Sequence, residues 1–98
     1  MTRAKSTETF YVIAYDIPND RRRARVHRIL CGFGRWTQYS VFECHLTEKQ
    51  MVLLRSKLDR HLRPDEDSIR FYQLCADCMA KTETIGSQKP AAETLYLV

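Results

Sequence analysis

The chain has 98 residues, of which 44% are apolar and 29% are charged, and its formal net charge is +4. This length fits one domain of a size at which buried surface only just offsets chain entropy, so pairing with a second chain would add stability. The apolar fraction excludes a disordered chain, and no apolar run approaches the roughly 18 residues needed to span a bilayer. We therefore expect a folded cytoplasmic protein with no membrane contact.

The N-terminal part of the sequence predicts a leader, a strand and a turn. Residues 1–9 are polar and carry no period, which is typical of a flexible leader. Residues 10–15 form a continuous run of aromatic and β-branched side chains, the composition of a central strand covered on both faces, and this run stops at Asp16. A proline-containing turn follows, after which Asp20 is expected to cap a helix that ends near residue 32 or 34.

The predicted helix has an apolar face and a basic face. Its apolar side chains recur with helical spacing at Val26, Ile29, Leu30 and Phe33. Its arginines fall on the opposite side, at Arg21, Arg25 and Arg28, with Arg22 and Arg23 beside them. The helix dipole disfavours cations in the first turn, so helix stability does not explain these arginines, whereas phosphate binding does. A solvated charged face is the alternative.

The middle of the chain predicts strand pieces and a second helix. Residues 35–46 are rich in aromatic and β-branched side chains without a helical period, so we expect a strand that is bent or split into a hairpin. Thr47 and Gln50 fit a capping box at the start of a helix. The apolar ridge of this helix continues to Leu62, and Pro64 stops it.

The last third of the sequence completes the predicted fold. Alternating side chains over 67–75 predict a further strand, and residues 82–86 predict a short one. With the middle segment folded as a hairpin, the order becomes β-α-β-β-α-β, an α+β fold of the ferredoxin-like type over 10–86. Residues 87–98 form a linker and an apolar end with no obvious neighbour in so small a sheet, so we expect that end to pair with a second subunit.

Asp16 is the strongest candidate for chemistry. A carboxylate directly after a central strand lies at the rim of the sheet, where oxygen ligands for Mg²⁺ belong. The alternative is that Asp16 holds the following turn through an Asx-type hydrogen bond. If two copies meet at a two-fold axis, both Asp16 side chains could share one cation. A bound Mg²⁺ could then polarise a phosphodiester and lower the pKa of a coordinated water, which would give hydrolysis.

Other chemically suggestive residues have structural alternatives. Four residues of the middle segment interleave a cation with aromatic rings, which suits base stacking as well as core packing. They are Arg35, Trp36, Tyr39 and Phe42. Cys75 and Cys78 have the spacing of half a zinc site, and the other half would have to come from Cys31, Cys44, His45 or a second chain. We expect the thiols to be reduced. No glycine-rich nucleotide motif indicates an organic cofactor.

Three stretches of the sequence together resemble the CRISPR-associated protein two family. They are Tyr-Asp-Ile-Pro-Asn-Asp-Arg-Arg-Arg over 15–23, Gln-Tyr-Ser-Val-Phe-Glu-Cys over 38–44 and Phe-Tyr-Gln-Leu-Cys over 71–75. The resemblance covers about 10–86 and implies a ferredoxin-like homodimer whose C-terminal strand exchanges between subunits. It also implies an endonuclease that acts on RNA or DNA with Mg²⁺ or Mn²⁺. The same family bridges dimers of the integrase, CRISPR-associated protein one, while foreign DNA is inserted into the CRISPR array.

Carried over residue by residue, the resemblance also implies site residues. The strand-end acid falls on Asp16 with Tyr15 before it, and the second-strand pair falls on Ser40 and Phe42. These four are the candidate catalytic residues, and Asp16 is also the candidate metal ligand. The family's arginines fall on Arg23, Arg25 and, more loosely, Arg35, so the candidate nucleic-acid-binding residues, with those of the basic helix face, are Arg21, Arg22, Arg23, Arg25, Arg28 and Arg35. A non-catalytic scaffold that holds DNA against the integrase, and a toxin-like ribonuclease of similar fold, are the alternative functions.

Overall fold

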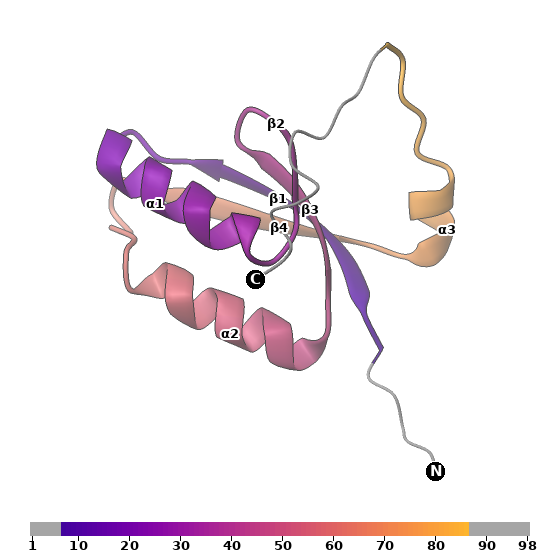
Figure 1. Ribbon diagram of the computed structural model, residues 1–98, viewed down its shortest axis with the longest axis horizontal. Coiled ribbons are helices and arrows are strands. Elements are labelled where there is room, and N and C mark those ends of the chain that lie inside the picture. The colour runs from indigo at the N-terminus through magenta and orange to yellow at the C-terminus, as the bar shows by residue number, and fades with distance from the viewer. Residues whose placement is uncertain (1–6, 87–98) are drawn as a thin grey trace.

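The computed structural model describes residues 7–86 of the chain. Within this range, four strands form one antiparallel sheet with the order β2-β3-β1-β4 (Figure 1). The strands are β1 (Thr9–Asp16), β2 (Arg35–Gln38), β3 (Val41–Leu46) and β4 (Ser68–Leu74), and the helices are α1 (Asp20–Cys31), α2 (Glu48–Asp59) and α3 (Ala76–Ala80). From β1 to β4 the order is β-α-β-β-α-β, so the predicted ferredoxin-like α+β fold is confirmed. The predicted leader over 1–9 is one residue too long, because Thr9 begins β1. Residues 1–6 of that leader and the predicted pairing of 87–98 lie outside the described residues.

The helices α1 and α2 pack side by side on one face of the sheet (Figure 1). The core between helices and sheet consists of Ile13, Tyr15, Ile17, Val26, Leu30, Phe42, Cys44, Leu46, Leu54 and Leu58. Burying each large apolar side chain contributes roughly 1.5–3 kcal/mol, so this layer is the main stabilising term of the domain. The predicted apolar stripe of α1 is confirmed, because Val26 and Leu30 are fully buried and Ile29 and Phe33 pack at the edge of the core.

The other face of the sheet carries no helix within the described residues, and we call it the open sheet face. Strand alternation places Phe10, Val12, Ala14 and Asp16 of β1 on this face. The strand register sets them beside Val41, Glu43 and His45 of β3 and beside Ser68, Arg70, Tyr72 and Leu74 of β4. The sequence predicts that both faces of β1 are covered. Among the described residues of one chain, α1 and α2 cover only one of these faces. Apolar side chains of β1 are therefore left half-buried on the open sheet face.

The cap of α1 differs from the prediction by one residue. Asn19, not Asp20, is the N-cap, and its side chain accepts a hydrogen bond from the Arg22 N–H at 2.9 Å. Asp20 is the first helical residue and pairs with Arg23 instead. Both residues are good caps, and the extended backbone at Asn19 decides between them. The helix ends at Cys31, next to Gly32, as predicted.

The middle segment forms the predicted hairpin, with an irregular register between Trp36 and Gln38. The capping box of α2 is also confirmed: the Gln50 N–H donates to Thr47 Oγ1 at 3.1 Å, and Gln50 Oε1 accepts from the Thr47 N–H at 2.8 Å. The sequence predicts that this helix continues through Leu62 and stops at Pro64. It ends earlier, at Asp59, and Leu62 packs against the core from beyond the helix end.

The chain after β4 departs most from the prediction. The predicted strand over 82–86 is wrong for the described chain, in which these residues are irregular and exposed and Ile85 is 100% exposed. A strand needs a neighbour to satisfy its backbone groups, and this segment runs away from the sheet (Figure 1). The short helix α3 was not predicted, because five residues are too few to show a helical period. Among the described residues, no helix is long and apolar enough to cross a membrane.

Candidate metal and nucleic-acid site

Asp16 ends β1 and lies exposed on the open sheet face, opposite Ser68 of β4. A solvent-accessible carboxylate at the end of a central strand is a hard oxygen donor of the kind that Mg²⁺ binds. Mg²⁺ usually takes one or two protein carboxylates and fills its octahedron with waters and substrate phosphate oxygens. The exposed Asp16 carboxylate has the chemistry that this cation needs, and its predicted role as a metal ligand stays a prediction.

The surroundings of Asp16 within one chain contain no ready-made ligand cluster. Among residues 7–86, no group of three or more His, Cys, Asp or Glu side chains could hold a metal ion. A two-fold axis that passes near the end of β1 would bring a second Asp16 to the same place. Within residues 7–86, the remaining ligands of a cation on Asp16 would therefore be waters, substrate oxygens or groups of a second chain.

Tyr15 points to the helix side of the sheet, opposite to Asp16. Its hydroxyl lies 3.1 Å from His27 Nδ1, and its backbone N–H donates to the Ser40 carbonyl oxygen at 3.0 Å. The His27 ring in turn contacts Phe42 edge to face, with ring centroids 5.1 Å apart. Phe42 is fully buried beneath this cluster.

The electrostatics of this cluster favour neutral side chains. Burial raises the pKa of the Tyr15 hydroxyl, and a hydrogen bond with Ser40 only partly offsets the rise. Burial also lowers the pKa of His27. At neutral pH the Tyr15 hydroxyl and the His27 imidazole are therefore both uncharged, and neither group is poised as an ionised catalyst.

The structure thus separates the four candidate catalytic residues into two places. Tyr15, Ser40 and Phe42 lie together on the helix side, whereas Asp16 lies on the open sheet face. Tyr15 and Ser40 also border a shallow depression of about 410 Å³. The geometry supports a positioning role for these residues, since the bond from Tyr15 to Ser40 ties the end of β1 to the hairpin. Their predicted catalytic role stays a prediction.

The His27 environment predicts a pH dependence of stability. Its folded pKa lies below the unfolded value of 6.5, so between the two values the unfolded state binds more protons. The free energy of unfolding should therefore fall as the pH is lowered from about 8 to about 5. Urea unfolding followed by circular dichroism across this range measures the slope, and His27→Gln should flatten it. Equal slopes in wild type and His27→Gln would contradict this account.

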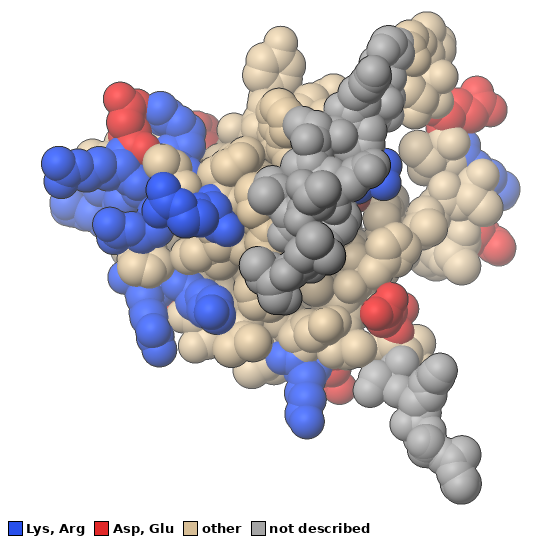
Figure 2. Space-filling view, in the orientation of Figure 1, with Lys and Arg blue, Asp and Glu red and all other residues tan. Residues whose placement is uncertain are grey.

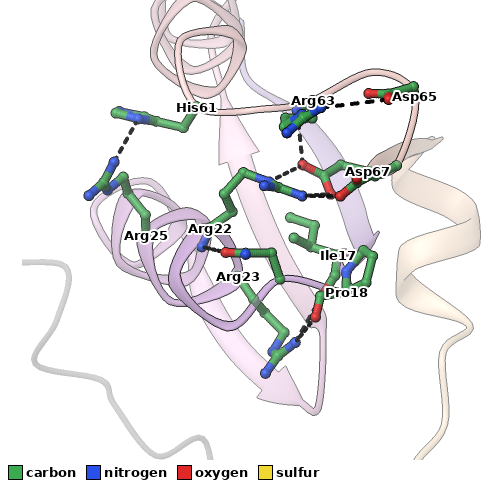
Figure 3. Close-up of polar contacts among 11 residues, drawn as sticks. Ile17, Pro18, Arg22, Arg23, Arg25, His61, Arg63, Asp65 and Asp67 are labelled. Carbon is green, nitrogen blue, oxygen red and sulfur yellow. Dashed lines mark hydrogen bonds and ion pairs between the residues drawn. The ribbon is translucent and has the colours of Figure 1, made fainter.

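Arg22 is tied into the fold by acids of the loop that precedes β4 (Figure 3). Its Nε lies 2.8 Å from Asp67 Oδ2, and its Nη2 lies 3.1 Å from Asp67 Oδ1 and 2.7 Å from Glu66 Oε1. The Asp67 side chain is fully excluded from solvent and also accepts from the Arg63 N–H at 2.9 Å. Asp67 was missed in the sequence, where an acid in a charged loop gives no sign of burial. Contact between Arg22 and nucleic acid stays a prediction, and the structure supports a structural role instead.

Arg23 is also engaged at the start of α1. Its guanidinium pairs with Asp20, and Nη1 donates to the Ile17 carbonyl oxygen at 2.9 Å (Figure 3). Arg25 is exposed, with Nη1 3.4 Å from Nδ1 of His61 (Figure 3). The end of α2 therefore borders α1 at this point, a proximity that the sequence does not show because the two residues are 36 positions apart.

The remaining arginines of α1 face solvent. Among the described residues, none forms a hydrogen bond or ion pair with the exposed guanidinium of Arg21 or Arg28. Together with Arg25 they form a basic surface on α1 that we call the arginine face, and Figure 2 shows Lys and Arg side chains gathered over this helix. Exposed guanidinium groups on one helix side can contact successive phosphates, and phosphate binding by this face stays a prediction.

Two further arginines lie on the open sheet face. Arg35 of β2 is exposed and is paired with Glu43 of β3. Arg70 of β4 is exposed and is paired with Ala14, two residues before Asp16 in β1. Arg70 Nη1 donates to the Tyr72 hydroxyl at 3.3 Å, so both side chains lie on the same face as Asp16. The sequence analysis missed Arg70, although the alternation of β4 already places it on the face that carries Asp16.

The fold and the site define a small α+β protein with one exposed carboxylate at the end of β1 and a basic helix beside it. The family model described as CRISPR associated protein Cas2 matches residues 9–82. The chain therefore belongs to the Cas2 family, and the resemblance found in its sequence is confirmed.

Individual relatives agree with this membership. The chain is 44% identical over 81 residues to the CRISPR-associated endoribonuclease Cas2 of Thermus thermophilus, covering 83% of this chain and 86% of that one. Its structure is similar to that of Streptococcus pyogenes Cas2, with a TM-score of 0.70, 29% identity, and coverage of 79% of this chain and 99% of that one. It is also similar to a chain of a partial Cas6-RT-Cas1–Cas2 complex, with a TM-score of 0.70, 31% identity, and coverage of 88% and 98%.

Proposed function

We propose that this protein is a metal-dependent endonuclease of CRISPR adaptation that hydrolyses phosphodiester bonds of RNA. The observation that carries the proposal is the exposed Asp16 carboxylate on the open sheet face. The endoribonuclease names of its relatives support RNA as the substrate. DNA is the alternative substrate.

A homodimer would complete the site. The open sheet face carries the half-buried apolar side chains of Val12, Val41 and Leu74, which a second copy would cover. Two-fold pairing across this face would bring both Asp16 carboxylates to one cation, which would also relieve their mutual repulsion. The arrangement agrees with the small size of the chain, whose core gains from added buried surface.

The roles of the side chains follow from their positions. Asp16 would hold Mg²⁺ or Mn²⁺, which when bound polarises a phosphodiester and lowers the pKa of a coordinated water. Arg70, on the same face, would neutralise a non-bridging phosphate oxygen. Tyr15 and Ser40 would fix the end of β1 from the helix side, so that the Asp16 carboxylate keeps its position.

A second function, as a scaffold that holds duplex DNA beside a Cas1-type integrase, is favoured by the arginine face. The guanidinium groups of Arg21 and Arg28 are free of partners among the described residues, and the relative in the Cas1–Cas2 complex suggests the partner. Such binding depends on counterion release and would weaken steeply with added salt. Both functions can belong to one protein, because the two surfaces differ.

The test is a cleavage and binding assay on purified protein. Labelled single-stranded RNA and duplex DNA are incubated with Mg²⁺, with Mn²⁺ and with chelator, and sedimentation determines the oligomeric state. We expect a dimer that cuts RNA with either cation and not with chelator. Absent or chelator-resistant cutting would reject the nuclease, and salt-sensitive duplex binding in the same sample would leave the scaffold as the function.

A further inference from the structure

Cys75 and Cys78 form an exposed pair of thiols at the end of β4. Cys75 directly follows the strand and Cys78 lies in α3, and both residues are exposed. Their sulfur atoms are 3.6 Å apart, much farther than the 2.05 Å or so of a disulfide bond. The pair lies at the far end of the sheet from Asp16, because Leu74 is paired with Phe10 and Ser68 with Asp16.

The separation of the two sulfur atoms matches the geometry of a zinc site. In a tetrahedral site with Zn–S bonds of about 2.3 Å, two thiolate ligands lie about 3.8 Å from each other. The observed 3.6 Å therefore needs almost no movement to place both sulfurs on one ion.

We propose that Cys75 and Cys78 chelate one Zn²⁺ ion as a dithiolate, a site separate from the proposed nuclease centre. The described part of the chain supplies only these two ligands, because no group of three or more metal-binding side chains is present in it. Cys44 cannot contribute, since it is fully buried in the core and burial raises the pKa of its thiol to about 12. Two positions of the ion are therefore left for water or for the same pair of thiols from a second copy.

Bound zinc would fix the direction in which the chain leaves the sheet. Cys75 belongs to the end of β4 and Cys78 to α3, so one ion would join the two. The exposed residues 82–86 follow directly after α3. A metal at this position would hold that segment at a defined angle without touching Asp16 or the arginine face.

The experiment is a titration of the reduced, tag-free full chain with Co²⁺, followed by Zn²⁺. We expect a sulfur-to-cobalt charge-transfer band together with the visible bands of tetrahedral cobalt, and both should disappear when Zn²⁺ displaces Co²⁺. Cys75→Ser and Cys78→Ser should each abolish the bands, and the matched control Cys31→Ser, at a half-buried thiol, should keep them. Far-ultraviolet circular dichroism checks that each variant keeps the fold of the wild type.

The result also reports where the remaining ligands come from. One metal ion per two chains with the band intensity of four thiolates would assign them to a second copy, and one ion per chain with two thiolates would assign them to water. No thiolate band in the reduced protein, or a band that survives both serine substitutions, would overturn the proposal. RNA cleavage in Cys78→Ser should equal wild type, so the zinc site and the nuclease are tested independently.

Discussion

Replacing Asp67 with alanine is expected to lower the free energy of unfolding by about 3 kcal/mol, because it leaves the Arg22 guanidinium without its buried partner. The pair is bidentate, the Asp67 side chain is 0% exposed and the Arg22 side chain is 17% exposed. The substitution also removes the acceptor of the Arg63 N–H. Urea unfolding at neutral pH, followed by circular dichroism, measures the loss.

A matched control separates burial from charge. Asp65, two residues earlier, pairs with Arg63 at 3.8 Å, and both side chains are more than half exposed. Screening makes such a pair worth about 0–1 kcal/mol, so Asp65→Ala should hardly change stability. Equal losses in Asp65→Ala and Asp67→Ala would contradict the assignment.

The pH dependence provides a further readout of the same pair. Hydrogen bonds from Arg22 lower the pKa of Asp67 below the usual value of 3.8. A depressed folded pKa adds stability that is present above the unfolded value and is lost as the pH falls through the folded one. The difference in stability between wild type and Asp67→Ala should therefore shrink below about pH 4.

The pairing of Arg22 also shows where sequence reasoning stops. Helical spacing places Arg21, Arg25 and Arg28 on the side away from Val26 and Leu30, and all three are exposed. It cannot show that a loop 45 residues later brings Asp67 to Arg22. Which arginines remain free for phosphate therefore also depends on tertiary contacts.

The local elements were more predictable. The apolar run of β1 and the capping box at Thr47 depend on neighbouring residues only, and both are confirmed. The segment over 82–86 has the composition of a strand, but a strand depends on a neighbour that the described chain does not place beside it. Because successive side chains of a strand point to opposite faces of the sheet, Tyr15 and Asp16 are expected on different faces. Their adjacency in the sequence motif does not show this separation.

Asp16→Asn is expected to reduce metal-dependent RNA cleavage to the level seen with chelator. The amide keeps the size of the side chain and removes the charge that holds a divalent cation. Because Asp16 is exposed, the free energy of unfolding should change by less than about 0.5 kcal/mol. Asp65→Asn, at an exposed acid of the loop before β4, should retain full cleavage. Cleavage by Asp16→Asn at the rate of wild type would remove this residue from the site.

Mixed dimers decide whether two chains share one cation. Differently tagged wild-type and Asp16→Asn chains are co-expressed, and dimers that carry both tags are isolated. If the two carboxylates bind one ion, a dimer with a single Asp16 loses most of its activity, because one carboxylate holds the cation much more weakly than two. Half of the wild-type rate would show instead that each chain forms its own site, and the shared centre across the open sheet face would be wrong.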